Sequence, residues 1–130
     1  MPIREIAERI LRESNAEDSL VLVDNTNSDP IAMLYALHPK RQVVQTGVPG
    51  AAAEIGTLLE KPGVRKVWFL RNTHDVSPGQ LNDRLRDRLR SQMNESAHKF
   101  EPYTPLEVWL MERVGGPRRE YFQELLEYQR

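Results

Sequence analysis

Residues 66–78 decide the fold, and they read KVWFLRNTHDVSP. Val67 to Leu70 are four successive apolar residues, a pattern typical of a strand that is buried on both faces of a sheet. Asn72 to Asp75 are polar and end the strand. Ser77 can cap a following helix, and Pro78 fits the first turn of that helix. The stretch therefore predicts a buried strand that leads through a polar loop into a capped helix.

The same unit occurs twice earlier in the chain. Each copy has a short apolar strand, a turn of polar residues or glycines, and a helix with a defined start. The first copy has a strand at Leu20 to Val23 and a helix at Ile31 to Leu37. The second has a strand at Gln42 to Thr46 and a helix at Ala51 to Glu60. Three such units in succession predict parallel strands joined by right-handed crossovers.

Apolar spacing indicates two further helices. Residues 2–14 have isoleucines at helical intervals between charged residues. After Pro78, every fourth residue is apolar: Leu81, Leu85, Leu89 and Met93. The same segment contains alternating charged residues, namely Asp83, Arg84, Arg86, Asp87, Arg88 and Arg90. We expect these arginines to lie on a solvated helix face, where the aspartates are spaced for pairing with Arg86 and Arg90.

The C-terminal third has a weaker pattern. Residues 97–103 are predicted as a strand, and residues 105–114 as a helix that turns Leu106, Trp109, Leu110 and Val114 toward the core. The tail, Tyr121 to Tyr128, fits either a helix or a strand. Its aromatic residues favour a strand, which we expect to join the sheet antiparallel. Trp68 and Trp109 are both interpreted as packing residues.

Together these elements predict one domain over residues 1–130. We expect an α/β fold, a Rossmann-like three-layer sandwich with a mainly parallel sheet, helices on both faces and an antiparallel C-terminal strand. A chain of 130 residues can bury a single core without covalent support, and this one contains no cysteine.

The composition limits the classes of function. With 18 basic and 19 acidic residues the net charge is −1, whereas nucleic-acid-binding domains usually have a basic excess. No apolar run approaches the roughly 20 residues that span a bilayer. The first 14 residues also lack the apolar core of a secretory signal. We therefore expect a soluble chain that does not bind nucleic acid, and the residues leave its oligomeric state open.

A candidate site is expected beyond the carboxyl ends of the strands, because open α/β sheets bind ligands there. The polar residues of this rim are Asp24, Asn25, Asn27, Asp29, Arg71, Asn72, His74 and Asp75. In one interpretation Asp24, Arg71, His74 and Asp75 form a polar pocket in which His74 acts as an acid or base and a carboxylate orients it. In the other, the rim residues end strands, cap helices and contact solvent. The second interpretation is favoured because no serine or second base completes a catalytic motif, so no catalytic residue is assigned.

The sequence predicts neither a cofactor nor a metal ion. The loop at residues 24–29 is acidic and lacks the glycines with which a nucleotide or methyl-donor cofactor is approached. Gly47 to Gly50 precedes a helix and is interpreted as a turn rather than a phosphate loop. His38, His74 and His98 lie on separate predicted elements, without the short spacing that is usual in a metal site.

Several stretches are similar to sequence segments that are found in one protein family. They are NSDPIAMLY at residues 27–35, VWFLRNTHDVSP at 67–78, FEPYTPLE at 100–107 followed by WLM at 109–111, and YFQELLEY at 121–128. The chain thereby resembles the C-terminal soluble region of bacterial dolichyl-phosphate-mannose-protein-mannosyltransferase-like membrane glycosyltransferases. The similarity extends over most of residues 20–128.

The resemblance implies a function as part of a larger enzyme. Members of this family are multi-span membrane proteins that transfer a sugar from a polyprenyl-phosphate carrier, with the catalytic carboxylate in a loop between membrane helices. This chain contains neither a span nor that loop, so no catalytic residue is carried over. The resemblance implies a non-catalytic accessory domain, extracytoplasmic or membrane-associated, whose partner is the membrane-embedded glycosyltransferase portion. Without the resemblance, a cytoplasmic location is expected.

Two other functions stay open. One is a small methyltransferase-like or nucleotide-binding protein that uses Asp24, Asp29 and His74 at the rim. The other is a structural interaction module that pairs through the helix containing Trp109 or through a sheet edge.

Overall fold

The computed structural model describes residues 2–23, 37–72, 80–100, 106, 109, 110, 113 and 123–130. Its elements in chain order are α1 (Pro2–Glu13), β1 (Ser19–Val23), β2 (Gln42–Gln45), α3 (Ala51–Glu60), β3 (Lys66–Asn72), α4 (Gln80–Gln92), β4 (Asn94–Phe100) and β5 (Gln123–Gln129). The predicted elements that fall in the described ranges up to residue 92 are confirmed. The predicted helix at Ile31 to Leu37 lies outside the described residues except for Leu37, which is helical and buried.

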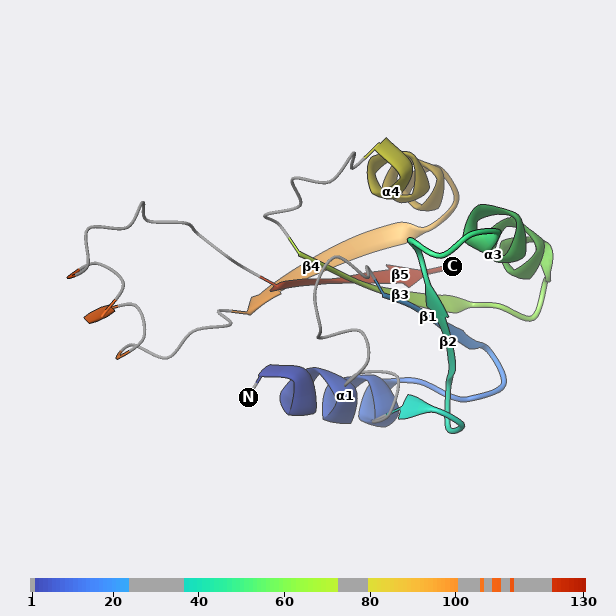
Figure 1. The fold of residues 1–130 in the computed structure, drawn as a ribbon. Coiled ribbons are helices and arrows are strands. Elements are labelled where there is room, and N and C mark those ends of the chain that lie inside the picture. Colours follow the sequence, from blue (N-terminus) through green and yellow to red (C-terminus); the bar gives the residue numbers. More distant parts are fainter. Residues whose placement is uncertain are drawn as a thin grey trace.

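The five strands form one mixed sheet in the order β2-β1-β3-β5-β4 (Figure 1). β1 pairs in parallel with β2 and β3, whereas β5 pairs antiparallel with β3 and β4. The predicted antiparallel C-terminal strand is confirmed. The prediction of a mainly parallel sheet holds only for β2-β1-β3, because the chain returns from β4 to place β5 between β3 and β4. The fold is therefore α/β with a mixed sheet.

β4 begins at Asn94, earlier than the strand predicted at residues 97–103. It reads NESAHKF and has no apolar run. As the edge strand of the sheet it pairs on one side only, and its Glu95 and His98 bond to charged side chains. An apolar run identifies a strand buried on both faces, so it does not reveal an edge strand of this kind.

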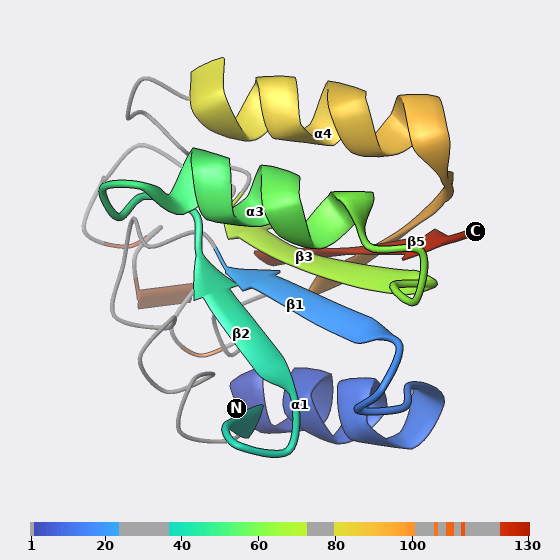
Figure 2. The same cartoon turned by 90° about the vertical axis from the view of Figure 1, so that its right-hand side faces the viewer.

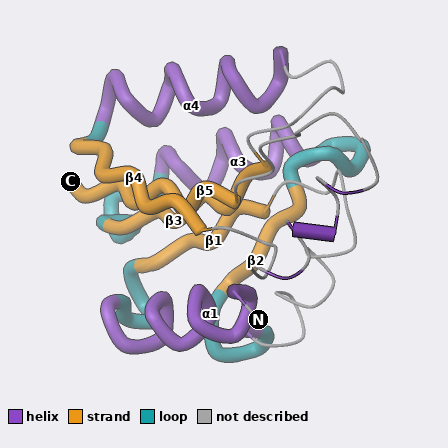
Figure 3. Tube along the Cα trace, turned by 90° about the vertical axis from the view of Figure 1, so that its left-hand side faces the viewer, coloured by secondary structure: helices purple, strands orange, loops and turns teal. Residues whose placement is uncertain are grey.

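Helices cover both faces of the sheet, with α3 and α4 on one face and α1 on the other (Figures 2 and 3). Successive side chains of β3 point to opposite faces of the sheet, because side chains alternate along a strand. Val67 and Phe69 pack in the cluster that contains α3 and α4 residues. Trp68 and Leu70 pack in the cluster that contains α1 residues. All four are buried, which explains why the run is continuously apolar and confirms Trp68 as a packing residue.

Three apolar residues near the C-terminus are exposed, whereas the sequence predicted that they face the core. Leu106, Trp109 and Leu110 are helical, and 64%, 49% and 48% of their surfaces are exposed. Arg113 lies next to them, with its Cζ 4.6 Å from the centroid of the Trp109 ring. The prediction that these residues face the core is wrong. Helical spacing reveals an apolar side but does not decide whether that side meets the domain's own core or something outside it. The fourth residue predicted to face inward, Val114, lies outside the described residues.

Candidate functional site

The carboxyl ends of the three parallel strands meet at one rim, as predicted. Val23, the last residue of β1, pairs with Gln45 of β2 and with Leu70 of β3. Beyond them, the N–H of Thr46 donates to the carbonyl of Val23 over 2.9 Å. β2 lies on one side of β1 and β3 on the other, so the order of the strands reverses beside β1. In open α/β sheets such a reversal marks the crevice where ligands bind.

Most of the predicted rim residues cannot be placed. Asp24, Asn25, Asn27, Asp29, His74 and Asp75 lie outside the described residues, so their contact role stays a prediction. Asn72 is the last residue of β3, at the rim.

Arg71 is also at the end of β3, but its side chain is mostly buried. Its Nε lies 3.3 Å from the Oε2 of Glu124, and the two side chains are 18% and 7% exposed. The two residues are cross-strand partners in the pairing of β3 with β5. This ion pair gives Arg71 a structural role beside the rim.

A second ion cluster lies under α4 and centres on Glu95. Arg86 and Arg90 each donate two hydrogen bonds to its carboxylate, over 2.9 to 3.2 Å. The hydroxyl of Tyr128 donates a fifth over 2.7 Å. Arg86 also lies 3.9 Å from Glu124, which links this cluster to Arg71. The cluster therefore connects α4 with β4, β5 and β3.

These contacts fix the protonation states in the cluster. Burial disfavours the charge of Glu95, but the hydrogen bonds from Arg86, Arg90 and Tyr128 outweigh burial and lower its pKa from 4.5 to about 2. Burial and the hydrogen bond to Glu95 raise the pKa of Tyr128. The hydrogen bond to Glu95 likewise raises the pKa of Arg86. A general acid or base needs a pKa near the working pH, so these groups fit a structural role.

A third cluster lies on the opposite face, beside α1. The Nζ of Lys66 lies 2.7 Å from one carboxylate oxygen of Glu127, and the Nε2 of His98 lies 3.3 Å from the other. Burial of Glu127 opposes its charge, but the hydrogen bonds from Lys66 and His98 prevail and lower its pKa. Lys66 also donates to the backbone carbonyl of Glu13 at the end of α1. The cluster thus connects α1 with three strands.

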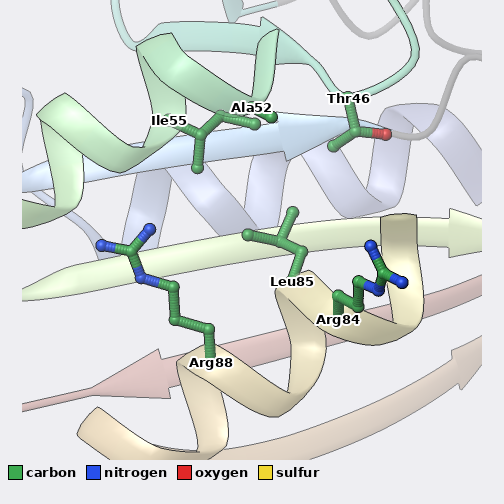
Figure 4. A pocket seen from close by; sticks show the side chains of 6 residues that line it. All are labelled: Thr46, Ala52, Ile55, Arg84, Leu85 and Arg88. Atoms are coloured by element: carbon green, nitrogen blue, oxygen red, sulfur yellow. The ribbon is translucent and has the colours of Figure 1, made fainter. Parts of the chain in front are cut away.

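A pocket opens between α3 and α4, next to the end of β2. It has a volume of about 150 Å³ and is lined by Thr46, Ala52, Ile55, Arg84, Leu85 and Arg88. Leu85 lies between the two arginines, and the guanidinium group of Arg88 extends from α4 toward α3 (Figure 4). Within the described part of the chain, no ion pair of either arginine is found. The pocket therefore combines an apolar lining with two positive charges that have no acidic partner among the described residues.

The four arginines of α4 divide into two pairs, which the sequence analysis did not foresee. Arg86 and Arg90 contact Glu95, so the predicted pairing of Arg90 with Asp87 is wrong. Arg84 and Arg88 line the pocket; Arg84 is exposed, as expected for a solvated helix face, whereas Arg88 is half-buried. A signal for this division was present in the sequence. At 100° per residue, the two pairs flank opposite sides of the apolar seam that contains Leu85.

The described residues contain no group of three or more His, Asp or Glu side chains that could hold a metal ion. In the same part of the chain, no helix is both long and apolar enough to cross a membrane. No family model matches the chain, and no curated protein or solved structure shows significant similarity to it. Its function is therefore inferred from its residues and their geometry.

Proposed function

We propose that the chain is a non-catalytic accessory domain of a lipid-linked-sugar glycosyltransferase. It contributes to acceptor access or to the stability of the membrane-embedded part. The observation that carries this proposal is the exposed apolar stripe formed by Leu106, Trp109 and Leu110. The stretches at residues 67–78 and 100–107, which resemble the soluble region of such enzymes, support it from the sequence.

The apolar stripe is suited to contact at a membrane boundary. About half or more of each of its side chains is in water, and covering apolar surface is favourable by about 25 cal/mol per Å². Tryptophan rings and the long stems of arginines are typical of the membrane–water interface, where one end is apolar and the other is solvated. Trp109 with the guanidinium of Arg113 over its ring has this character. We infer that the stripe contacts the membrane-embedded part of the enzyme.

The ion clusters of the sheet support a role as a scaffold. The carboxylates of Glu95 and Glu127 are held by cations on opposite faces of the β4–β5 pair. Both pKa values are lowered, which keeps these groups ionised and in place. A Rossmann-like unit stabilised in this way presents the strand-end rim, with Asn72 beside the site predicted there, as a second contact surface.

The test uses a full-length homologue that contains both the membrane part and this domain. Sugar transfer, acceptor choice and thermal stability are measured with and without the domain. We expect at least one of the three to change when the domain is removed. If all three are unchanged, the accessory role is wrong.

A second experiment addresses the apolar stripe itself. Trp109 and Leu110 are replaced together by serine in the full-length protein, and Val48→Ser serves as the control because Val48 is also an exposed apolar residue, at 38%. The stripe variant should reproduce part of the effect of removing the domain, and the control should not. Equal effects of the two changes would argue against contact through the stripe.

A second candidate function is supported by the strand order. The reversal beside β1 creates the type of crevice in which α/β proteins bind nucleotides or methyl-donor cofactors. Calorimetric titration of the chain with S-adenosylmethionine and with nucleotides tests this candidate. Micromolar binding would favour it over the accessory role.

A further inference from the structure

The pocket between α3 and α4 is lined by two positively charged side chains of α4, Arg84 and Arg88. Arg84 is exposed and Arg88 is half-buried, and in the described ranges neither has an acidic partner. The neighbouring Arg86 and Arg90 share the carboxylate of Glu95. Arginines that stabilise the fold are thus separated from arginines that face a pocket, although all four belong to one helix.

The lining between the two charges is apolar. Ala52 and Ile55 of α3 lie opposite Leu85 of α4 (Figure 4). The Arg88 guanidinium reaches α3, since a Cβ at Gly56 would lie 3.3 Å from its terminal nitrogen. A cavity of about 150 Å³ is large enough for a molecule the size of benzene. The pocket therefore has room for a small ring or a short chain, with a guanidinium group on either side of Leu85.

Two polar features lie at the end of the pocket near β2. Thr46 is 1% exposed, and its Oγ1 has no hydrogen-bond partner among the described residues. A buried hydroxyl without a hydrogen-bond partner lowers stability unless it bonds to a ligand or a water molecule. In addition, α3 begins after Gly50 without a side-chain cap, and Ala52 of its first turn lines the pocket. Uncapped amide groups at the start of a helix favour a negative charge.

We propose that this pocket binds a small organic anion. Its acidic group, a carboxylate or a phosphate ester, is bound by Arg84 with the hydroxyl of Thr46 and the start of α3, and Arg88 adds a second positive charge from the other side of Leu85. Its compact apolar part packs against Ile55 and Leu85. This binding activity goes beyond the accessory role and does not depend on it, so an assay of the isolated chain and the assay of the full-length enzyme can fail separately.

The experiment titrates the 130-residue chain with four probes and follows binding by NMR. Phenyl phosphate and benzoate carry both a charge and a ring, inorganic phosphate lacks the ring, and benzyl alcohol lacks the charge. We expect the two ring anions to bind about tenfold more tightly than the other two probes, since both features of the pocket are then used. Their affinity should fall as the salt concentration rises. Equal binding of benzyl alcohol, or no saturable binding of either ring anion, overturns the proposal.

Substitutions of the lining arginines test whether the ring anions bind in this pocket. Arg84→Gln should weaken the ring anions about tenfold, because it removes a hydrogen bond to a charged group. Arg88→Gln should weaken them severalfold, because it removes a positive charge from the pocket. Arg65→Gln is the control, since Arg65 is an exposed arginine outside the pocket. Unchanged affinity in both pocket variants, or an equal loss in the control, overturns the assignment of the site.

Thr46→Val tests the hydroxyl while keeping the volume of the side chain. Because Oγ1 has no partner in the described structure, the free variant should unfold at the same or a higher temperature than the wild type. Its affinity for the ring anions should fall severalfold. Undiminished affinity overturns the role of Thr46 in the site.

Discussion

Replacing Glu95 by glutamine should destabilise the domain at neutral pH and destabilise it about half as much at pH 3. The carboxylate of Glu95 receives five hydrogen bonds, four from Arg86 and Arg90 and one from Tyr128. Glutamine has nearly the same shape but no charge. The substitution therefore leaves two guanidinium groups, of which Arg86 is only 18% exposed, without their shared carboxylate.

The magnitude follows from the pKa of Glu95. This pKa is about 2 in the folded protein, against an ordinary value of 4.5. The difference corresponds to about 3 kcal/mol of folding free energy. Since only 15% of the side chain is exposed, solvent screening reduces this figure little. A lowered pKa stabilises the fold above the unfolded pKa, and this stability is lost as the pH falls through the folded pKa. The contribution is thus complete above about pH 5 and falls to roughly half of its full value at pH 3.

Urea denaturation of the wild type and of Glu95→Gln at pH 7 and at pH 3 measures this contribution. At pH 7 the variant should lose about 3 kcal/mol, equivalent to a melting temperature roughly 10 °C lower. At pH 3 the difference between the two proteins should be about half as large. Glu60→Gln is the control, because Glu60 is an exposed glutamate. A loss below about 0.5 kcal/mol at pH 7, or a loss that is the same at both pH values, would refute the reasoning.

Three further outcomes are expected. Acrylamide should quench only one of the two tryptophans, since Trp109 is 49% exposed and Trp68 is buried, and Trp109→Phe should remove the accessible component; two equally quenched tryptophans would contradict this. Gly50→Ala should cost about 1 to 2 kcal/mol in urea denaturation because Gly50 has a φ of 81°, and an unchanged midpoint would contradict it. Gly56→Ala should stabilise by about 0.5 to 1 kcal/mol, because alanine favours helices and only the mobile end of Arg88 lies close; a lower midpoint would contradict it.

The candidate site could be predicted only in part. The convergence of the strand ends followed from the three predicted units, because parallel neighbouring strands end at the same side of a sheet. The role of Arg71 did not follow, since its partner Glu124 is on a strand that lies far along the chain. The apolar side of the helix at Trp109 was visible in the spacing, but its exposure depends on what the rest of the fold leaves uncovered.

The sequence by itself determined most of the helices and strands in the part of the chain that the structure describes. The apolar run at Val67 to Leu70 and the helix at Ala51 to Glu60 were both predictable, because strand burial and helix periodicity depend on residues at most a few positions apart. Only the tertiary structure decided that β5 enters the sheet between β3 and β4. It also decided that Arg86 and Arg90 meet Glu95 while Arg84 and Arg88 face a pocket. The physical reason is that these contacts join elements distant in the chain, and such contacts form only once the whole core has packed.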